Sequence, residues 1–273
     1  MKLSFNECDF HITHKNKTVF SHSLNNPCLF LGVGESNFDM YRGNFDITDY
    51  LSERLPLTQF AIESNDNSRH VISFSINTKT VFKMTVSETN ETRLKIDFEA
   101  VDKKYNRFWL RLNATETEKV FGCGEQLTYL NLRGKNFPLW SSEPGVGRNK
   151  NSYVTWQADL HDKAGGDYYN TNYPQPTFIS NEKFFCHLET TAYADFDFTH
   201  KEFHELQCWN IPEYLLFDVE QSFPALLKNI TDIFGRQPEL PEWVYNGVIL
   251  GIQGGTEAII ARVAAAKKAG VQV

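Results

Sequence analysis

Residues 93–100 read Arg-Leu-Lys-Ile-Asp-Phe-Glu-Ala, and this alternation of apolar and polar side chains is typical of a half-buried antiparallel strand. Similar alternation recurs at 71–76, 108–112 and 193–198, with clusters of polar, turn-forming residues between the apolar segments. Many short strands of this kind predict a mainly β protein, built as an antiparallel β-sandwich.

Composition narrows the classes of partner. The net charge of −7 is spread along the chain without a Lys/Arg cluster, which argues against binding to nucleic acid. No apolar run approaches the roughly 20 residues that cross a membrane, and charge follows Met1 too soon for a secretory signal. We therefore predict a cytoplasmic protein without membrane association.

The cysteines are odd in number and scattered, without a Cys-x-x-Cys pair; they are Cys8, Cys28, Cys123, Cys186 and Cys208. Such a set argues against a disulfide framework and against zinc. No nucleophile elbow, zincin helix or P-loop occurs either, so the sequence predicts neither metal nor cofactor.

The pattern changes near Ser222, which can cap a helix over 223–230. Pro238 and Pro241 then impose an extended path, because proline is excluded from helix interiors and inner strands. We place a domain boundary here, with a β-sandwich domain at 1–235 and a second domain beginning at 236.

Residues 247–252 form a nearly continuous apolar run, which is typical of a strand buried on both faces of a parallel sheet. A helix over 257–269, capped by Thr256 and ended by Gly270, is predicted to follow, and 271–273 begin to look like another strand. This β-α unit is too small to bury a core and predicts a domain extending past residue 273. The alternative is a helix that docks on the sandwich and ends the protein.

Two stretches, 121–148 and 153–178, combine Trp and Tyr with Arg, Glu, Asn and Gln among glycines. We interpret both as glycine-rich loops. Apolar rings beside planar polar groups suit a sugar, whose C–H face stacks on a ring while its hydroxyls form hydrogen bonds. The alternative is a pair of loops that pack on their own aromatic side chains.

Several segments together resemble glycoside hydrolase family 31, and within it the sulfoquinovosidases; they are 122–126, 131–135, 137–148, 153–159, 165–178, 235–241 and 250–257. The resemblance implies a galactose-mutarotase-like β-sandwich followed by a (β/α)8 barrel, of which 236–273 would be the first, truncated β-α unit. It also implies a retaining mechanism with two aspartates and no metal. Both aspartates would lie on later barrel strands, so this chain alone is predicted to be inactive.

The same resemblance identifies Gln253 as a sugar ligand. Gln253 ends the predicted strand, and barrel active sites lie at the carboxyl ends of strands. The alternative is that Gln253 caps the backbone of the following Gly254-Gly255 turn. Glu143 and Arg148 are further candidates, because in this family a loop of the N-terminal domain reaches over the barrel mouth.

The predicted partners are thus a sugar, either a sulfoquinovoside or an α-glucoside, and the missing barrel as an intramolecular partner. The competing hypothesis is a carbohydrate-binding β-sandwich without catalytic activity.

Overall fold

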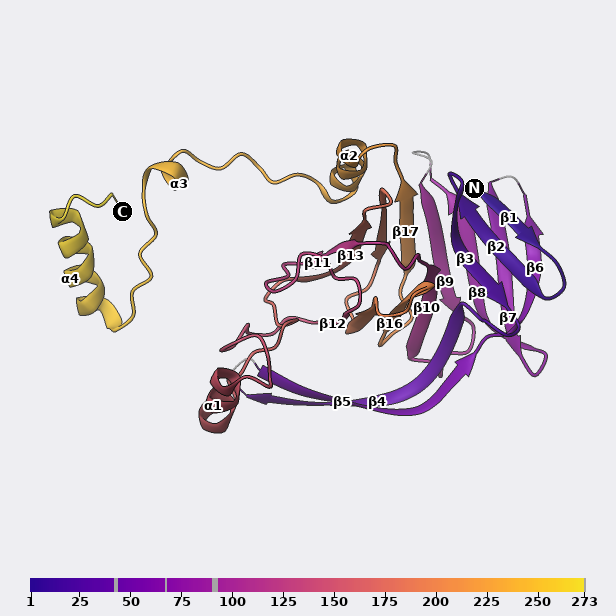
Figure 1. The fold of residues 1–273 in the computed structure, drawn as a ribbon, viewed down its shortest axis with the longest axis horizontal. Coiled ribbons are helices and arrows are strands. Elements are labelled where there is room, and N and C mark those ends of the chain that lie inside the picture. Colours follow the sequence, from indigo (N-terminus) through magenta and orange to yellow (C-terminus); the bar gives the residue numbers. More distant parts are fainter. Residues whose placement is uncertain (42–43, 67, 90–92, 273) are drawn as a thin grey trace. The chain divides into compact units, whose positions relative to one another are not determined.

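The structure is a computed structural model that describes residues 1–41, 44–66, 68–89 and 93–272 (Figure 1). The chain divides into two compact units, Met1–Lys228 and Asn229–Val273. The first unit is built mainly of antiparallel sheets, which confirms the prediction of a mainly β protein. The strands predicted around 71–76, 93–100, 108–112 and 193–198 are all present.

The larger sheet of the first unit has eight antiparallel strands. In spatial order they are β11 (Val120–Gly124), β13 (Pro174–Ser180), β14 (Phe184–Leu188), β17 (Tyr214–Val219), β9 (Leu94–Ala100), β8 (Lys79–Glu88), β7 (Arg69–Ile76) and β6 (Gln59–Asn65). Along β9 the apolar residues are buried and the charged ones are more exposed, as the alternation predicted.

The second sheet has six strands and carries the features discussed below. In order they are β12 (Asn136–Leu139), β15 (Ala194–Asp197), β16 (Phe203–Cys208), β10 (Arg107–Asn113), β4 (Leu29–Tyr41) and β5 (Asn44–Pro56). A small third sheet contains β1 (Lys2–Phe5), β2 (Asp9–His14) and β3 (Lys17–Ser23).

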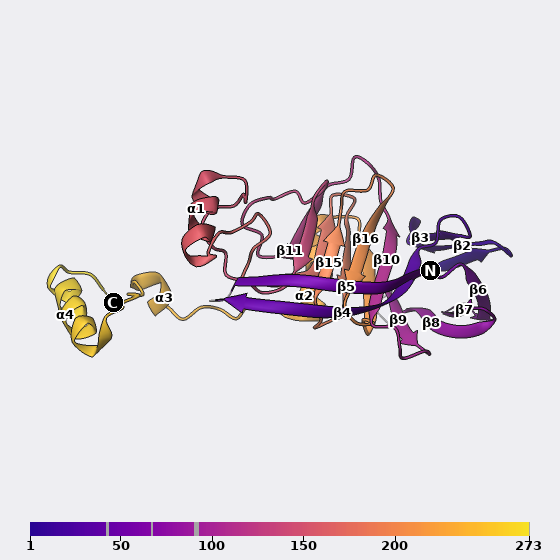
Figure 2. The same cartoon turned by 90° about the horizontal axis from the view of Figure 1, so that it is seen from below.

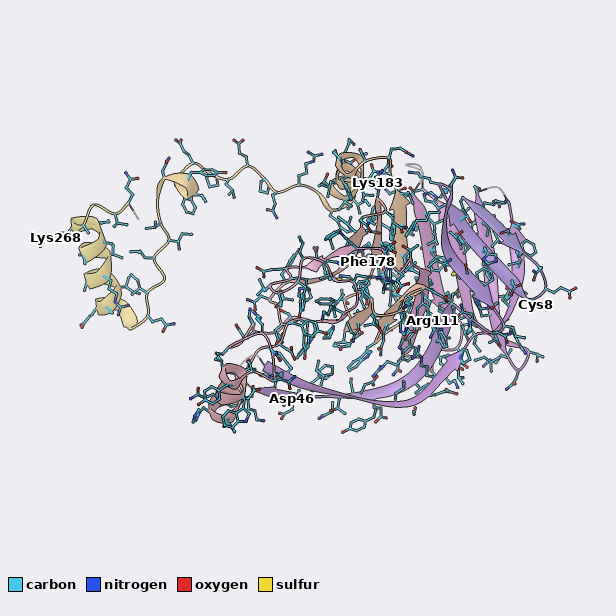
Figure 3. The ribbon with its side chains drawn as sticks, in the orientation of Figure 1. Cys8, Asp46, Arg111, Phe178, Lys183 and Lys268 are labelled. Carbon is cyan, nitrogen blue, oxygen red and sulfur yellow. The ribbon has the colours of Figure 1, made fainter. Side chains whose placement is uncertain are left out.

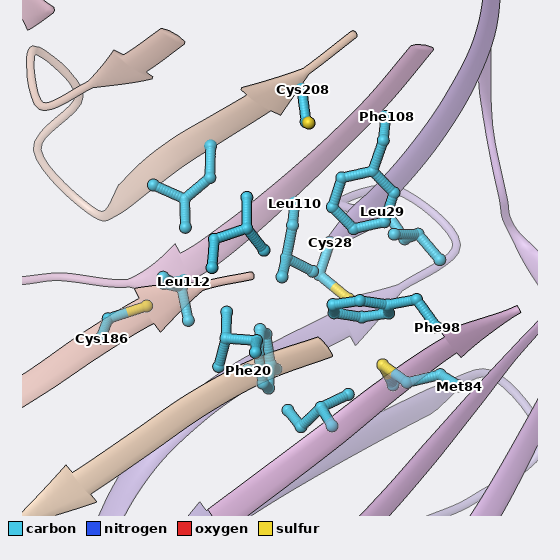
Figure 4. Close-up of a cluster of buried hydrophobic side chains, with 14 of the residues drawn as sticks. Phe20, Cys28, Leu29, Met84, Phe98, Phe108, Leu110, Leu112, Cys186 and Cys208 are labelled. Carbon is cyan, nitrogen blue, oxygen red and sulfur yellow. The ribbon is translucent and has the colours of Figure 1, made fainter. Parts of the chain in front are cut away.

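Aromatic contacts join the two large sheets across one hydrophobic core. Phe108 of β10 lies 5.0 Å from Phe98 of β9 between ring centroids, and Phe178 of β13 lies 6.2 Å from Phe196 of β15. Figure 4 shows part of this core, where Phe20, Met84 and Phe98 lie on one side of Phe108 and Leu110. Each fully buried Phe contributes roughly 1.5–3 kcal/mol, so most of the phenylalanines serve stability.

Strands β4 and β5 extend beyond the sheet as a two-stranded hairpin (Figure 2). Strand β10 pairs with β4 only over Leu29–Gly32, whereas β5 pairs with β4 as far as Tyr41. The residues of β4 beyond Gly34 are exposed, including Phe38 and Met40. The hairpin therefore projects its outer half away from the core and toward α1 (Tyr153–Asp162).

Helix α2 (Phe223–Phe234) forms where the sequence predicted it, and Ser222 Oγ accepts from Ala225 N at 3.4 Å. It runs four residues past the predicted end at 230 and stops one residue before the predicted domain boundary at 235. Residues 235–241, with Pro238 and Pro241, have no regular secondary structure, as proline requires.

The second unit contains α3 (Trp243–Asn246) and α4 (Gly255–Lys268). The strand predicted over 247–252 is absent: these residues have no regular secondary structure, and Ile249 is 83% exposed. A strand requires a neighbouring strand to complete its hydrogen bonds, and the described part of this unit contains no strand. One hydrogen bond, from Val248 N to Gln272 O at 3.0 Å, joins the two predicted strand segments. Val273 lies outside the described residues.

The ends of α4 test two local predictions. Thr256 is not the cap: the helix begins at Gly255, with Gly254 at the N-cap in the left-handed region, so Thr256 lies inside the first turn. The predicted C-terminus is confirmed, because Gly270 has φ +78° and Val271 N donates to Ala266 O, as in a Schellman motif.

No helix in the described ranges is long and apolar enough to cross a membrane. The five cysteines carry free thiols, and all except Cys8 are buried.

Candidate functional site

The candidate site is built on the segment between β12 and β13, residues 140–173, which we name the site loop. Its two ends are held together by hydrogen bonds from Ser142 N to Thr171 O (2.9 Å) and from Ser141 Oγ to Asn172 O (3.0 Å). The loop thus leaves and re-enters the sandwich at one place, and its interior is free to form structure of its own.

Glycines allow two segments of the site loop, 144–147 and 164–166, to pass each other at close range. Val146 N donates to Ala164 O at 2.8 Å, and Gly166 N donates to Val146 O at 2.9 Å. A Cβ on Gly166 would lie 2.1 Å from the Pro144 carbonyl oxygen, so a side chain there would block the crossing. This local packing explains the glycine content that the sequence displayed.

The second predicted glycine-rich loop, 153–178, is not a loop throughout, because 153–162 form α1. Ser152 is the N-cap, and its Oγ accepts from Thr155 N at 3.4 Å. Thr155 is buried, and its hydroxyl donates to Val146 O at 3.2 Å. The prediction of a loop was wrong here, since the capping serine outweighed the turn-forming composition around it.

Arg148 and Glu143 differ in their surroundings. The Nη1 atom of Arg148 donates to the carbonyl oxygens of Pro144 (2.9 Å) and Asn170 (3.4 Å), and so braces the two arms of the site loop. The exposed Glu143 has no hydrogen bond or ion pair among the residues that the structure describes. The structure therefore brings these two predicted residues into one loop and leaves the Glu143 carboxylate open to solvent.

A hollow of about 270 Å³ lies between the tip of the β4–β5 hairpin and the site loop; we name it the charged hollow. It is lined by carboxylates, lysines and aromatic rings, chiefly Asp39, Phe45, Asp46, Trp140, Lys150, Asp159, Lys163 and Tyr169. Figure 3 shows Asp46 near the tip of the hairpin, close to α1. The hollow lies entirely within the first unit.

Lys150 organises one wall of the charged hollow. Its Nζ lies 3.1 Å from Asp159 Oδ2 and donates to Gly165 O at 2.7 Å, which ties α1 to the glycine crossing. The pair between Lys163 and Asp39 is longer, at 3.9 Å, and both side chains are more than half exposed. An exposed pair of this kind contributes little to stability, so these two charges remain available to a ligand.

Burial raises the pKa of two side chains near the charged hollow, Tyr169 and Asp195. Desolvation, reinforced by the charge of Asp167, raises the pKa of Tyr169. Desolvation also raises the pKa of Asp195 on β15 to about 6, helped by the nearby carboxylates of Asp197 and Glu205 and opposed by a hydrogen bond from Asn136. The tyrosine hydroxyl is therefore a neutral hydrogen-bonding group at neutral pH.

Gln253 belongs to the second unit and immediately precedes Gly254, the N-cap of α4. Its side chain is exposed, and α4 has no side-chain hydrogen bond at its N-cap. The alternative role, in which Gln253 caps the following turn, is thus not seen among the described residues.

A close contact within the site loop gives a prediction with a built-in control. Gly147 has φ +77°, and a Cβ there would lie 2.2 Å from Thr155 Oγ1; Gly134 has φ +79° and open space around it. Gly147→Ala should cost about 3 kcal/mol, from backbone strain plus overpacking against α1. Gly134→Ala should cost only the backbone strain, about 1–2 kcal/mol. Urea unfolding measures the loss of stability in each variant. Equal losses would show that a side chain at position 147 does not overpack against Thr155.

The sequence indicated part of the charged hollow and missed the rest. Trp140, Asp159 and Tyr169 lie in the stretches selected for their aromatic and polar content. Asp39, Phe45 and Asp46 come from a hairpin about a hundred residues earlier in the chain, where no motif marks them. Their proximity depends on how far the β4–β5 hairpin projects, which no local pattern encodes.

No family model matches this chain. It is 45% identical over 268 residues to the sulfoquinovosidase of Escherichia coli (strain K12), covering 98% of this chain and 39% of that protein. It is 44% identical over 264 residues to the sulfoquinovosidase of Agrobacterium fabrum (strain C58), covering 97% and 38%.

A solved structure agrees with these relatives. A glycoside hydrolase family 31 sulfoquinovosidase from E. rectale, in complex with an aza-sugar inhibitor, matches with a TM-score of 0.88 and 45% identity. The match covers the whole of this chain and 40% of that one. The chain thus spans about two fifths of the length of the proteins it resembles.

Proposed function

Because this chain is related over nearly its whole length to the N-terminal part of family 31 sulfoquinovosidases, we propose that it forms that part of a retaining α-glycosidase that hydrolyses sulfoquinovosides. The observation that carries the proposal is the 45% identity along 98% of the chain, combined with the TM-score of 0.88. The antiparallel sandwich supplies the N-terminal domain, and the residues after about 235 begin the catalytic barrel.

The second unit supports the barrel proposal through its unsatisfied apolar surface. A hollow of about 650 Å³ in this unit is lined mainly by apolar side chains, among them Trp243, Val248, Leu250, Ile259 and Val263. A parallel strand and its helix need neighbours on both sides to bury such a surface. We propose that 247–252 become the first barrel strand, and that the remaining barrel is the intramolecular partner that covers this hollow.

Within that barrel Gln253 would stand at the carboxyl end of the first strand, where barrel enzymes bind their substrates. Its exposed side chain offers an amide that donates to one sugar hydroxyl and accepts from another. Glu143, with its carboxylate open to solvent, and Arg148, which fixes the same loop, would approach the sugar from the N-terminal domain. The two catalytic aspartates would come from the later strands.

The test compares two proteins on two substrates. One protein is the 273-residue chain; the other, the extended protein, continues it with the part of the E. coli relative beyond the match. The extended protein should hydrolyse an aryl α-sulfoquinovoside faster than the matching α-glucoside, and the chain alone should hydrolyse neither. A folded extended protein inactive on both would contradict the proposal, as would reproducible turnover by the chain. Binding without hydrolysis by both proteins would favour the carbohydrate-binding hypothesis.

The role of Gln253 is tested in the extended protein. Gln253→Ala should lower kcat/KM by about 100-fold, or close to 3 kcal/mol, because a site built to bond a hydroxyl loses its partner. The matched control is Gln237→Ala, which removes an exposed amide from the linker and should leave kcat/KM unchanged. Equal kinetics for the two variants would exclude Gln253 as a ligand.

A further inference from the structure

The first unit contains a further hollow, of about 400 Å³, to which the β4–β5 hairpin contributes Phe38. We name it the aromatic hollow. Its walls are rings and prolines, with hydroxyls nearby: Phe38, Trp140, Pro174, Pro176, Thr191 and Tyr193. None of the described residues that line it carries a charge, in contrast to the charged hollow, which Trp140 also lines.

Two of the three rings that line the aromatic hollow are in contact with Trp209. Trp209 lies 4.3 Å from Tyr193 and 6.0 Å from Phe38 between ring centroids. The guanidinium of Arg107 lies over Trp209 at 4.6 Å, and Asp49 of β5 holds that guanidinium in turn. These contacts join the β4–β5 hairpin to the rest of the sheet. They also hold Phe38 and Tyr193 in place without a ligand.

The remaining ring is fixed from another direction. Phe45 of the hairpin packs its ring against Trp140, with centroids 4.8 Å apart and planes at 73°. Phe38 nevertheless remains 51% exposed, although a large apolar ring is normally covered when the fold can cover it. The hollow therefore keeps a preformed aromatic surface in contact with water.

Size, shape and charge together restrict the ligand. The volume lies within the range of about 300–1,000 Å³ that is usual for small-molecule sites. Aromatic faces bind the C–H face of a pyranose ring, and the nearby hydroxyls of Ser141 and Thr191 can bond its rim. A sulfonate would lose its hydration here without meeting a cation, which costs free energy.

We propose that the aromatic hollow is a binding site for a neutral pyranose sugar, stacked on Phe38 and Tyr193. The choice of a sugar rests on the proposed function, whereas the preference for a neutral one rests on the uncharged lining. The site is complete within the first unit, so binding requires neither Gln253 nor the catalytic aspartates.

The experiment is ligand-observed saturation-transfer NMR, with calorimetric titration, on the full 273-residue chain. The probes are maltose, methyl α-D-glucopyranoside and methyl α-sulfoquinovoside. Maltose and the glucoside should bind with dissociation constants of about 1 mM, and the sulfoquinovoside about tenfold more weakly. Tyr193→Ala and Phe38→Ala should each weaken maltose binding about fivefold. The control Tyr153→Ala removes an exposed ring from α1, outside the hollow, and should change nothing.

Each outcome decides the inference. Phe38 is half exposed, so Phe38→Ala tests the site even if Tyr193→Ala fails to fold. Absence of saturable maltose binding, or equal binding by wild type and Phe38→Ala, would overturn the proposal. Equal affinity for the sulfoquinovoside would overturn the neutral-ligand assignment. Because hydrolysis is measured separately in the extended protein, a chain that binds no sugar would leave the proposed activity untouched.

Discussion

Ile249→Asp is expected to leave the 273-residue chain unchanged in stability, yet to destabilise the barrel of the extended protein by about 4 kcal/mol or more. In this chain Ile249 is 83% exposed, so a carboxylate there meets only water. In a barrel strand the same position is covered on either face, because parallel strands are buried on both sides. Urea unfolding of both proteins, followed by far-UV circular dichroism, measures the difference.

The matched control is Leu130→Asp, since Leu130 is also 83% exposed but lies in the first unit, in the turn region after β11. This substitution should be silent in both proteins. If Ile249→Asp were equally silent in the extended protein, 247–252 would not be a buried strand, and the barrel assignment of the second unit would fall. The sandwich would be unaffected by that result.

Arg107→Met is expected to destabilise the first unit by about 3 kcal/mol. The Arg107 side chain is only 4% exposed, and its Nη2 donates to Asp49 Oδ1 at 2.8 Å while its plane covers Trp209. Methionine fills a similar volume but leaves the partly buried Asp49 carboxylate without its cation. Urea unfolding gives the loss, and hydrogen exchange should report an additional loosening of β5 near Asp49.

Two further variants separate charge from packing. Arg107→Met combined with Asp49→Asn should recover part of the loss, because no charge is then left uncompensated. Lys83→Met breaks the exposed pair with Glu63, whose side chains are 35% and 39% exposed, and should change stability by less than about 1 kcal/mol. If Arg107→Met cost no more than Lys83→Met, the hairpin would not be anchored through Arg107, and the preformed aromatic hollow would lose its support.

Sequence patterns predicted the local structure well where one interaction dominates. Alternation along 93–100 located β9, Ser222 located the start of α2, and Gly270 located the end of α4. Thr256 shows the limit of such reasoning: a threonine before a helix is a good cap, yet the left-handed Gly254 let the helix begin earlier. Composition likewise concealed α1, because its residues were judged with their glycine-rich neighbours.

The sequence by itself determined the antiparallel strands and the resemblance to family 31, because side-chain alternation and motif order are properties of neighbouring residues. It also supplied Gln253, Glu143 and Arg148 as candidate ligands, and these roles remain proposals. Only the tertiary structure decided that Asp49 would reach Arg107, and that Phe38 and Asp46 would face the site loop. These contacts depend on strand order and on the projection of the β4–β5 hairpin. For 247–252 the apolar pattern favours a strand, but a strand forms only when a neighbour completes its hydrogen bonds.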